Sequence, residues 1–257
     1  MNLFDLKGKN AFVIGAGGIG TAIAQGLSWQ GANVVVADVS EKNAKNAVAK
    51  ITSDGGKADY IVADITTKSD IEAMFAEMDK KIDRLDILVN SAGIGAFSSA
   101  LDMTEEIWNT VINHFLNSVF WCCQQGGRRM VKNGYGKIIN LASMSGMIAT
   151  GDAGSVYAAA KAGVIQLTKN LGCEWIPSGV NVNAISPGMV RTALTDPMFD
   201  PAMGGDPAMV EVFDAQIPLG RMAQPIDMVG PALFLASSAS DYLVGQNIVA
   251  DGGQTCR

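Results

Sequence analysis

The feature that most restricts the fold is a regular alternation of short apolar strands with amphipathic helical segments along 257 residues. Strand-like runs rich in β-branched residues occur as AFVIG, ANVVVAD, ADYIVAD, DILVN, GKIINLAS, VNVNAIS and NIVAD. Helical spacing of apolar residues fills residues 19–30, 41–53, 68–81, 104–133, 155–176 and 225–238. This repetition predicts an α/β fold: a doubly wound, seven-stranded parallel sheet with helices on both faces.

No proline- or serine-rich linker divides the chain, so we expect one domain over residues 1–257. The long irregular segment is 187–224, where four prolines interrupt any regular element. Segments of this length in compact domains are usually functional. Apolar side chains such as Met189, Phe199 and Phe213 favour a flap over something apolar, so we expect a substrate lid at about residues 189–224.

Composition excludes several classes of protein. The net charge is −6 and the 19 basic residues are scattered, which argues against a nucleic-acid partner. Apolar runs are only as long as strands, so we expect no membrane span, and the first residues lack a secretory signal, so we expect a cytoplasmic protein. Four cysteines without CxxC spacing and a single histidine, His114, predict no metal site.

A glycine-rich turn follows the first predicted strand and opens the first predicted helix. Gly15, Gly17 and Gly20 form the spacing GxGxxG there. Glycine permits the tight turn and lets the backbone approach a pyrophosphate, while the helix N-terminus points unpaired N–H groups at the anion. The motif in this context predicts a dinucleotide site.

Asp38 ends the second predicted strand, 18 residues after Gly20. An acid at about this separation accepts hydrogen bonds from the adenosine ribose hydroxyls and repels a 2′-phosphate. Val39, not a basic residue, follows it, so NAD is favoured over NADP as the cofactor. The alternative is that Asp38 and Ser40 simply begin the next helix as capping residues.

Two helical residues have the spacing for acid–base chemistry. Tyr157 and Lys161 are four positions apart, on one face of a helix. A nearby ammonium lowers the pKa of a phenol, which otherwise ionises near 10. Ser143 ends a preceding strand, where the carboxyl edge of such a sheet forms the ligand crevice.

The order of these parts resembles the short-chain dehydrogenase/reductase family over the whole chain. The order comprises the glycine turn, the acid, Asn90-Ser91-Ala92-Gly93, Ser143 and YxxxK, followed by Pro187-Gly188 and Asp251-Gly252-Gly253. The resemblance implies a single Rossmann-type domain that transfers a hydride between NAD and a secondary alcohol or ketone. It also implies a homotetramer, with which the aromatic residues of the fourth and fifth predicted helices are consistent.

The resemblance further implies roles for individual residues. Ser143, Tyr157 and Lys161 would be catalytic: Ser143 binds the substrate oxygen, Tyr157 exchanges its proton, and Lys161 lowers the phenol pKa and holds the nicotinamide ribose. The cofactor would be held by Gly15, Gly17, Ile19, Gly20, Asp38, Asp64, Ile65, Asn90, Ala92, Gly93, Tyr157, Lys161, Pro187, Gly188, Val190 and Thr192.

One departure from the family pattern concerns the proton relay. The position of the family's relay asparagine is Phe115, and Asn113 and Asn117 lie on other sides of a regular helix unless the backbone bulges. This opens an alternative of another class, a catalytically impaired NAD-binding sensor or scaffold. The retained Ser143, Tyr157 and Lys161 favour an enzyme.

Phrases such as NLASMSG and NAISPGMVRT are most similar to family members that act on polyols, sugars and related hydroxy compounds. A 3-oxoacyl-thioester reductase is the alternative enzyme, disfavoured because such enzymes commonly use NADP. Arg191 and Arg221 flank the lid and leave open whether the substrate carries an anionic group.

Overall fold

The computed structural model describes residues 2–95, 98–151 and 154–256. One parallel sheet has the strand order β3-β2-β1-β4-β5-β6-β7, which confirms the doubly wound α/β prediction. The strands are β1 (Asn10–Ile14), β2 (Asn33–Asp38), β3 (Ala58–Val62), β4 (Ile87–Asn90), β5 (Gly136–Leu141), β6 (Val180–Pro187) and β7 (Asn247–Ala250).

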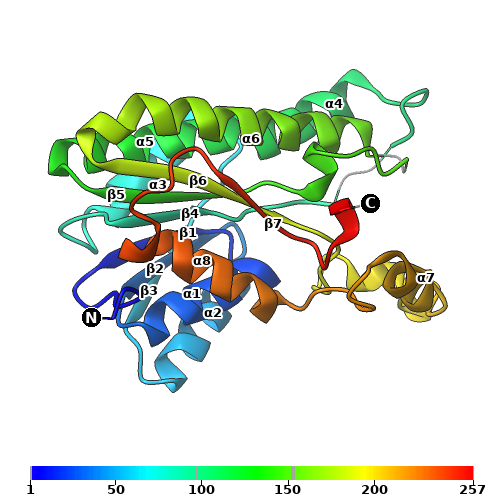
Figure 1. The fold of residues 1–257 in the computed structure, drawn as a ribbon, viewed down its shortest axis with the longest axis horizontal. Helices are drawn as coiled ribbons and strands as arrows, with labels where there is room; N and C mark the ends of the chain where they lie inside the picture. The colour runs from blue at the N-terminus through cyan, green and yellow to red at the C-terminus, as the bar shows by residue number, and fades with distance from the viewer. Residues whose placement is uncertain (1, 96–97, 152–153, 257) are drawn as a thin grey trace.

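Helices cover both faces of this sheet. In Figure 1, α3, α4, α5 and α6 lie on one side and α1, α2 and α8 on the other. Their bounds are α1 (Gly18–Trp29), α2 (Glu41–Ser53), α3 (Lys68–Met78), α4 (Glu105–Ile112), α5 (Ser118–Asn133), α6 (Ser155–Trp175), α7 (Met209–Gln216) and α8 (Val229–Ala236). Among the described residues, no helix combines the length and apolar character needed to cross a membrane.

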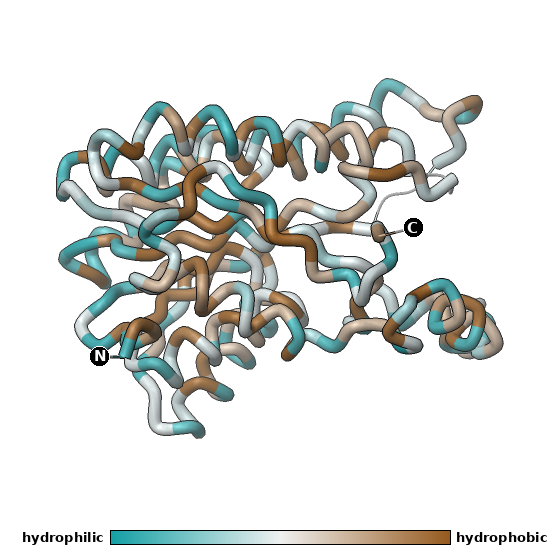
Figure 2. The backbone as a smooth tube through the Cα atoms, in the orientation of Figure 1, coloured by the Kyte–Doolittle hydropathy of each residue, from teal (hydrophilic) through white to brown (hydrophobic). Residues whose placement is uncertain are grey.

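Two apolar cores lie on the two faces of the sheet. Along β1, alternate side chains enter opposite cores, with Phe12 and Ile14 in one and Ala11 and Val13 in the other. All four side chains are almost fully buried. Figure 2 accordingly shows brown, apolar strands in the interior and teal segments mostly at the periphery. Burial on both faces explains why these strands read as continuous apolar runs.

The helix starts show how local sequence positions the site. Ser40, Thr67 and Thr104 each accept a backbone N–H of the first turn of α2, α3 and α4. At α1 the capping position is Gly17, which has no side chain to do this. The first N–H groups of α1 are therefore left for another acceptor.

Two segments differ from the predicted elements. The prediction that prolines prevent regular structure throughout residues 187–224 was wrong for α7, because Pro207 and Pro218 flank this helix and neither lies within it. The predicted helix over residues 104–133 is interrupted by a π-helical turn, η1 (Asn113–Asn117). In Figure 1, α7 projects beyond the two helical layers.

Candidate active site

The glycine turn after β1 has the geometry of an anion cradle. Gly15 has φ of 100°, and a Cβ there would lie 2.5 Å from the backbone nitrogen of Ala92. A Cβ on Gly20 would collide with the Gly15 carbonyl oxygen. At Gly17, by contrast, a Cβ would meet nothing within 4 Å. The turn is therefore tightly packed at Gly15 and Gly20 but has open space at Gly17, where α1 begins. This arrangement fits a phosphate held by backbone N–H groups.

Asp38 holds the glycine turn and the start of α2 together. Its Oδ2 accepts the Ala16 N–H at 2.7 Å, and its Oδ1 accepts the Ser40 N–H at 2.8 Å. Ser40 in turn caps α2. Asp38 therefore does help to begin the next helix, as the alternative interpretation of the sequence predicts. Each carboxylate oxygen can accept a second hydrogen bond, so this geometry leaves acceptor capacity for ribose hydroxyls.

The ends of β3 and β4 form the next part of the crevice. Ile65 is buried and Asp64 accepts the Thr66 N–H at 2.8 Å. Asn90 donates to the Asn140 side chain at 2.8 Å, while its Oδ1 is buried without a hydrogen-bond partner in the described part of the chain. Ala92 and Gly93 follow β4 directly.

Orphan polar atoms at this edge support a bound polar ligand. Besides Asn90 Oδ1, the Ser91 Oγ and the His114 Nε2 are buried and have no hydrogen-bond partner within residues 2–95, 98–151 and 154–256. Such atoms in folded proteins are normally satisfied by water or a ligand. From the sequence, His114 lacks partners for a metal site and neighbours the relay position, where a structural role is the favoured interpretation; its orphan nitrogen became visible only in the fold.

The segment after β6 returns to the glycine turn. Gly188 donates its N–H to the Ala250 carbonyl at 3.1 Å, immediately after Pro187. Val190 is buried and pairs with Ala223 in an isolated parallel bridge. A Cβ on Gly18 would lie 2.9 Å from Thr192 Cγ2. The segment after β6 therefore lies beside the glycine turn at the carboxyl edge of the sheet.

The three predicted catalytic residues also lie together. Ser143, after β5, hydrogen-bonds the Tyr157 hydroxyl and accepts the Ser145 N–H at 3.1 Å. Lys161 donates to the Leu141 carbonyl at 2.6 Å, and its Nζ lies 5.7 Å from the centroid of the Tyr157 ring. The phenol and the amine thus face the same space, as their helical spacing predicts.

Burial governs the acidity of this pair. It lowers the pKa of Lys161 to about 7, and it raises the pKa of Tyr157 above its ordinary value of 10.0, while the Ser143 hydrogen bond opposes that rise. The sequence predicted a lowered phenol pKa. The difference arises from burial of the phenol itself, which disfavours its charged form.

Phe115 lies beside this pair, where the resemblance placed a relay asparagine. Its ring is T-shaped against Tyr157, with centroids 5.0 Å apart. The π-turn is a backbone bulge of the kind that Asn113 or Asn117 would need in order to take the place of Phe115. Both side chains are nevertheless exposed, and they hydrogen-bond each other at 2.6 Å. Neither amide replaces Phe115 in the site.

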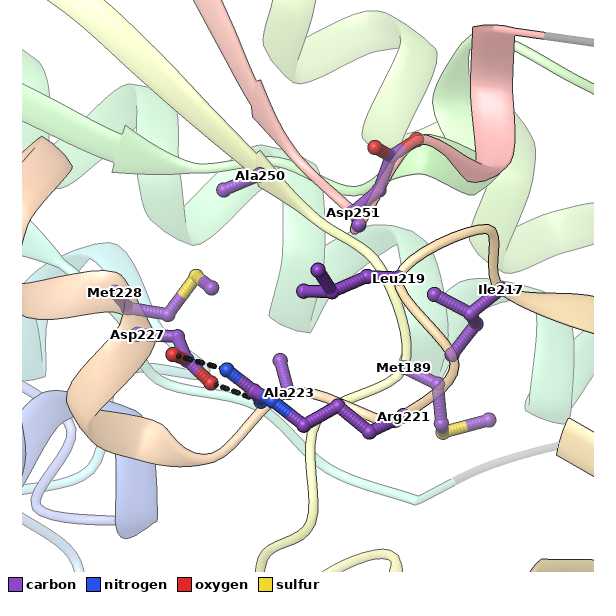
Figure 3. Close-up of a pocket in the computed structure, with 10 residues that line it drawn as sticks. Met189, Ile217, Leu219, Arg221, Ala223, Asp227, Met228, Ala250 and Asp251 are labelled. Carbon is purple, nitrogen blue, oxygen red and sulfur yellow. Dashed lines mark hydrogen bonds and ion pairs between the residues drawn. The ribbon is translucent and has the colours of Figure 1, made fainter. Parts of the chain in front are cut away.

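A separate cavity of about 160 Å³ lies at the base of the lid. Figure 3 shows its apolar side chains, including Met189, Ile217 and Leu219, around the ion pair of Arg221 and Asp227. The guanidinium makes two contacts with that carboxylate, at 2.7 and 2.9 Å. None of the residues that line the cavity is a predicted catalytic residue.

The second arginine that flanks the lid is paired as well. Arg191 lies 3.0 Å from the Asp196 carboxylate and stacks over the Phe199 ring. Both cations that the sequence left open for an anionic substrate are thus each paired with an aspartate. Nothing in the residue spacing alone pointed to this pairing.

Comparisons with known proteins agree with the fold and the crevice. Residues 14–255 match the family model described as enoyl-(acyl carrier protein) reductase. An NAD-dependent glycerol dehydrogenase of Listeria innocua is 38% identical, over 99% of this chain and 96% of its own length. A 2-dehydro-3-deoxy-D-gluconate 5-dehydrogenase of Bacillus subtilis is 40% identical, over 99% and 97%.

A solved structure is similar over the same extent. It is a gluconate 5-dehydrogenase from Burkholderia cenocepacia in complex with NADP and tartrate, with a TM-score of 0.91, 32% identity, and coverage of 100% of this chain and 98% of that one. The chain belongs to the short-chain dehydrogenase/reductase family. It is an oxidoreductase of a nucleotide-binding family that acts on hydroxyl and keto groups.

Proposed function

We propose that this protein is an NAD-dependent dehydrogenase of secondary alcohols, with a polyol, a sugar or a related hydroxy compound as its substrate. The observation that carries the proposal is the cluster at the crevice: Ser143 hydrogen-bonded to Tyr157, with Lys161 one helical turn further along α6. The phenol and the serine hydroxyl are placed to bind one substrate oxygen.

In this proposal the catalytic residues have distinct tasks. Ser143 donates a hydrogen bond to the substrate oxygen, Tyr157 exchanges the hydroxyl proton, and Lys161 favours the phenolate electrostatically. NAD, when bound, accepts the hydride. The base in alcohol oxidation is the phenolate, and burial raises the pKa of the phenol. We therefore expect alcohol oxidation to be faster at alkaline pH.

Cofactor contacts are proposed for the residues that surround the crevice. They are Gly15, Gly17, Ile19, Gly20, Asp38, Asp64, Ile65, Asn90, Ala92, Gly93, Tyr157, Lys161, Pro187, Gly188, Val190 and Thr192. The open space at Gly17 and the orphan Asn90 Oδ1 support this assignment, since a phosphate and a ribose would satisfy such groups.

NAD is proposed over NADP because of the charge at the end of β2. The Asp38 carboxylate is fixed by two backbone N–H groups, and the following Val39 is 68% exposed and offers no cation to a 2′-phosphate. The Listeria relative is named as NAD-dependent. The Burkholderia structure holds NADP, so the preference is a property to be measured in this chain.

An uncharged polyol is favoured over a sugar acid by the lid. Arg191 and Arg221 are each paired with an aspartate, so binding a carboxylate there would first require breaking an ion pair. Relatives named for glycerol, threitol and galactitol are consistent with such a substrate.

The test is a substrate panel that follows NADH formation at alkaline pH, with a parallel series in NADP. The panel contains glycerol, threitol, galactitol and gluconate, and a 3-oxoacyl thioester is tested in the reductive direction with NADH and NADPH. Turnover of a polyol with NAD supports the proposal. Turnover of the thioester with NADPH alone would favour the reductase alternative, and tight NADH binding without any turnover would favour a sensor or scaffold.

We also propose that residues 1–257 form one dinucleotide-binding domain with a lid over residues 189–224, and that copies assemble as a homotetramer through the fourth and fifth predicted helices, which are α4 with α5 and α6 in the structure. Trp108 on α4 is 45% exposed, whereas Trp121 and Trp175 pack partly against the core of the chain itself. A cytoplasmic location is proposed as well, in line with the free thiols of the four cysteines.

A further inference from the structure

The π-turn η1 buries an aromatic ring and exposes the amides around it. The Ser118 N–H donates to the Asn113 carbonyl, five residues back, which widens the helix at this point. Phe115 at the centre of the turn is 4% exposed. Asn113 and Asn117 face outward. The turn therefore directs the one apolar ring of this segment inward.

The ring reaches both members of the acid–base pair. Its centroid lies 5.0 Å from that of Tyr157, with an interplanar angle of 86°, and 4.8 Å from the Lys161 Nζ. On another side, a Cβ on Gly93 would lie 3.5 Å from the Phe115 Cε1. Phe115 thus lies between the loop after β4 and the reacting face of α6.

The surroundings of the ring are apolar. Phe115 clusters with buried Val111, Val156 and Ala160, and with partly buried side chains that include Ile94. An aromatic face attracts an ammonium, but more weakly than full hydration stabilises it. Burial accordingly lowers the pKa of Lys161 to about 7. A ring at this position therefore limits how much water can stabilise the charge on Lys161.

Other ionisable groups on the neighbouring elements contribute little charge in the neutral range. On η1, burial and the charge of Lys161 lower the pKa of His114 below 6.5, while Asp64 after β3 opposes that shift. On α5, burial raises the pKa of Cys122 and Cys123 above 9.0. Glu105 and Glu106 of α4 are exposed to solvent. The sequences of β6 and of residues 142–151, which follow β5, contain no ionisable side chain.

We propose that Phe115 is a positioning residue that shields Lys161 from water and thereby sets the pH at which Tyr157 becomes a base. It acts through Lys161 and Tyr157 and does not itself take up a proton. This inference deepens the proposed function, and the predicted change in the pH dependence of turnover rests on that function. The predicted effect of Phe115 on the phenol pKa does not, because it is measured in the cofactor-free protein.

The first experiment measures the phenol directly in the cofactor-free protein. Phe115→Asn admits a polar group beside Lys161, and Phe115→Leu is the matched control that keeps the site apolar. Each variant, and the wild type, is titrated by its absorbance near 295 nm against the same protein carrying Tyr157→Phe, which isolates the Tyr157 phenol from the other tyrosines. Circular dichroism and thermal melting establish that each variant is folded.

The expected result is a lower phenol pKa in Phe115→Asn, by about one unit, because a hydrated Lys161 keeps its charge to higher pH. Phe115→Leu should leave the phenol pKa unchanged or raise it. If both variants shift the phenol equally, or neither does, the ring is ordinary packing and the inference is wrong. Should Phe115→Asn fail to fold, the same comparison is made with Phe115→Gln.

The second readout is the pH profile of alcohol oxidation. The limb over which log kcat rises with pH should move to lower pH in Phe115→Asn and stay in place in Phe115→Leu. An unmoved limb in a Phe115→Asn enzyme that does turn over alcohol would contradict the inference. If no variant has activity but the phenol still titrates at lower pH in Phe115→Asn, the proposed function fails while the role of Phe115 stands.

Discussion

At the scale of single residues, some side chains of the site each have two roles, one structural and one in the proposed binding or catalysis. Asp38 fixes the glycine turn and the α2 start through backbone N–H groups, and its remaining acceptor capacity faces the proposed ribose site. Lys161 is tied to the Leu141 carbonyl and also approaches the Tyr157 ring. Substitutions at these positions therefore change both binding and local structure, and their tests need separate readouts.

Tyr157→Phe removes the proposed base while keeping the ring and its contact with Phe115. We expect kcat to fall by roughly 10²- to 10⁴-fold, the usual contribution of a general acid–base group. NADH affinity, measured by fluorescence titration, should remain within a few fold of wild type. Unchanged turnover in this variant would contradict the assignment of the phenol.

Asp38→Asn removes the charge and keeps one carbonyl acceptor at the end of β2. The ratio of kcat/KM for NAD to that for NADP should fall by at least about tenfold, because the repulsion of a 2′-phosphate is lost. Steady-state kinetics with both cofactors measures this ratio. Asn43→Asp, an added charge in the first turn of α2, serves as a control that should leave it nearly constant.

Lys161→Met tests the ionisation of the buried amine through stability. The folded-state pKa of about 7 lies below the ordinary value of 10.5, so between these values the unfolded chain binds the extra proton. Stability of the wild type should therefore rise from pH 7 to pH 9 by about 2–3 kcal/mol more than that of the variant. Urea unfolding of the cofactor-free proteins at both pH values checks the sign; parallel curves would show that Lys161 titrates normally.

At the scale of secondary-structure elements, the lid has its own small core. Phe199, Ile217 and Met222 are buried together, and the rings of Phe199 and Phe213 lie 5.7 Å apart in a T-shaped contact. The segment thus has its own apolar cluster, and its two ends are paired at the bridge between Val190 and Ala223. A short helix between prolines is held in this way even though its own propensity is marginal.

Phe199→Ala should loosen the lid without unfolding the sheet. Loss of a buried ring costs about 3–5 kcal/mol locally, and we expect faster proteolytic cleavage within the lid and a higher KM for the alcohol. Limited proteolysis followed by mass spectrometry locates the cleavage. Met203→Ala, at a side chain that is 64% exposed, is the matched control and should behave as wild type.

At the scale of the whole molecule, the two apolar cores bury the central strands, and the carboxyl edge of the sheet gathers the crevice residues from β1 to β6. Residues 189–224 continue from β6 at that same edge.

The proposed tetramer predicts different effects of charge on two exposed tryptophans. Trp108→Asp on α4 should reduce the assembly from four copies to two, because a charge would be buried in the interface. Trp29→Asp on α1, a side chain that is 51% exposed, should leave the assembly intact. Light scattering coupled to size-exclusion chromatography measures both masses. Equal masses for the two variants would mean that α4 is not the interface.

The sequence by itself determined the doubly wound α/β class, the glycine turn and the helical spacing of Tyr157 and Lys161, because each depends on residues close together in the chain or on a regular period. It placed the elements to within a few residues at most ends. It missed α7, because we expected the prolines to interrupt all of residues 187–224. Two of them, Pro207 and Pro218, flank this helix and do not lie within it.

Only the tertiary structure decided what surrounds the acid–base pair. The π-turn sends Phe115 inward and its neighbouring amides outward, and contact with α6 sets that choice. The pairing of the lid arginines, the approach of Thr192 to Gly18, and the raised phenol pKa likewise depend on segments distant in the chain. Burial and contact between such segments are properties of the packed molecule, and no local pattern records them.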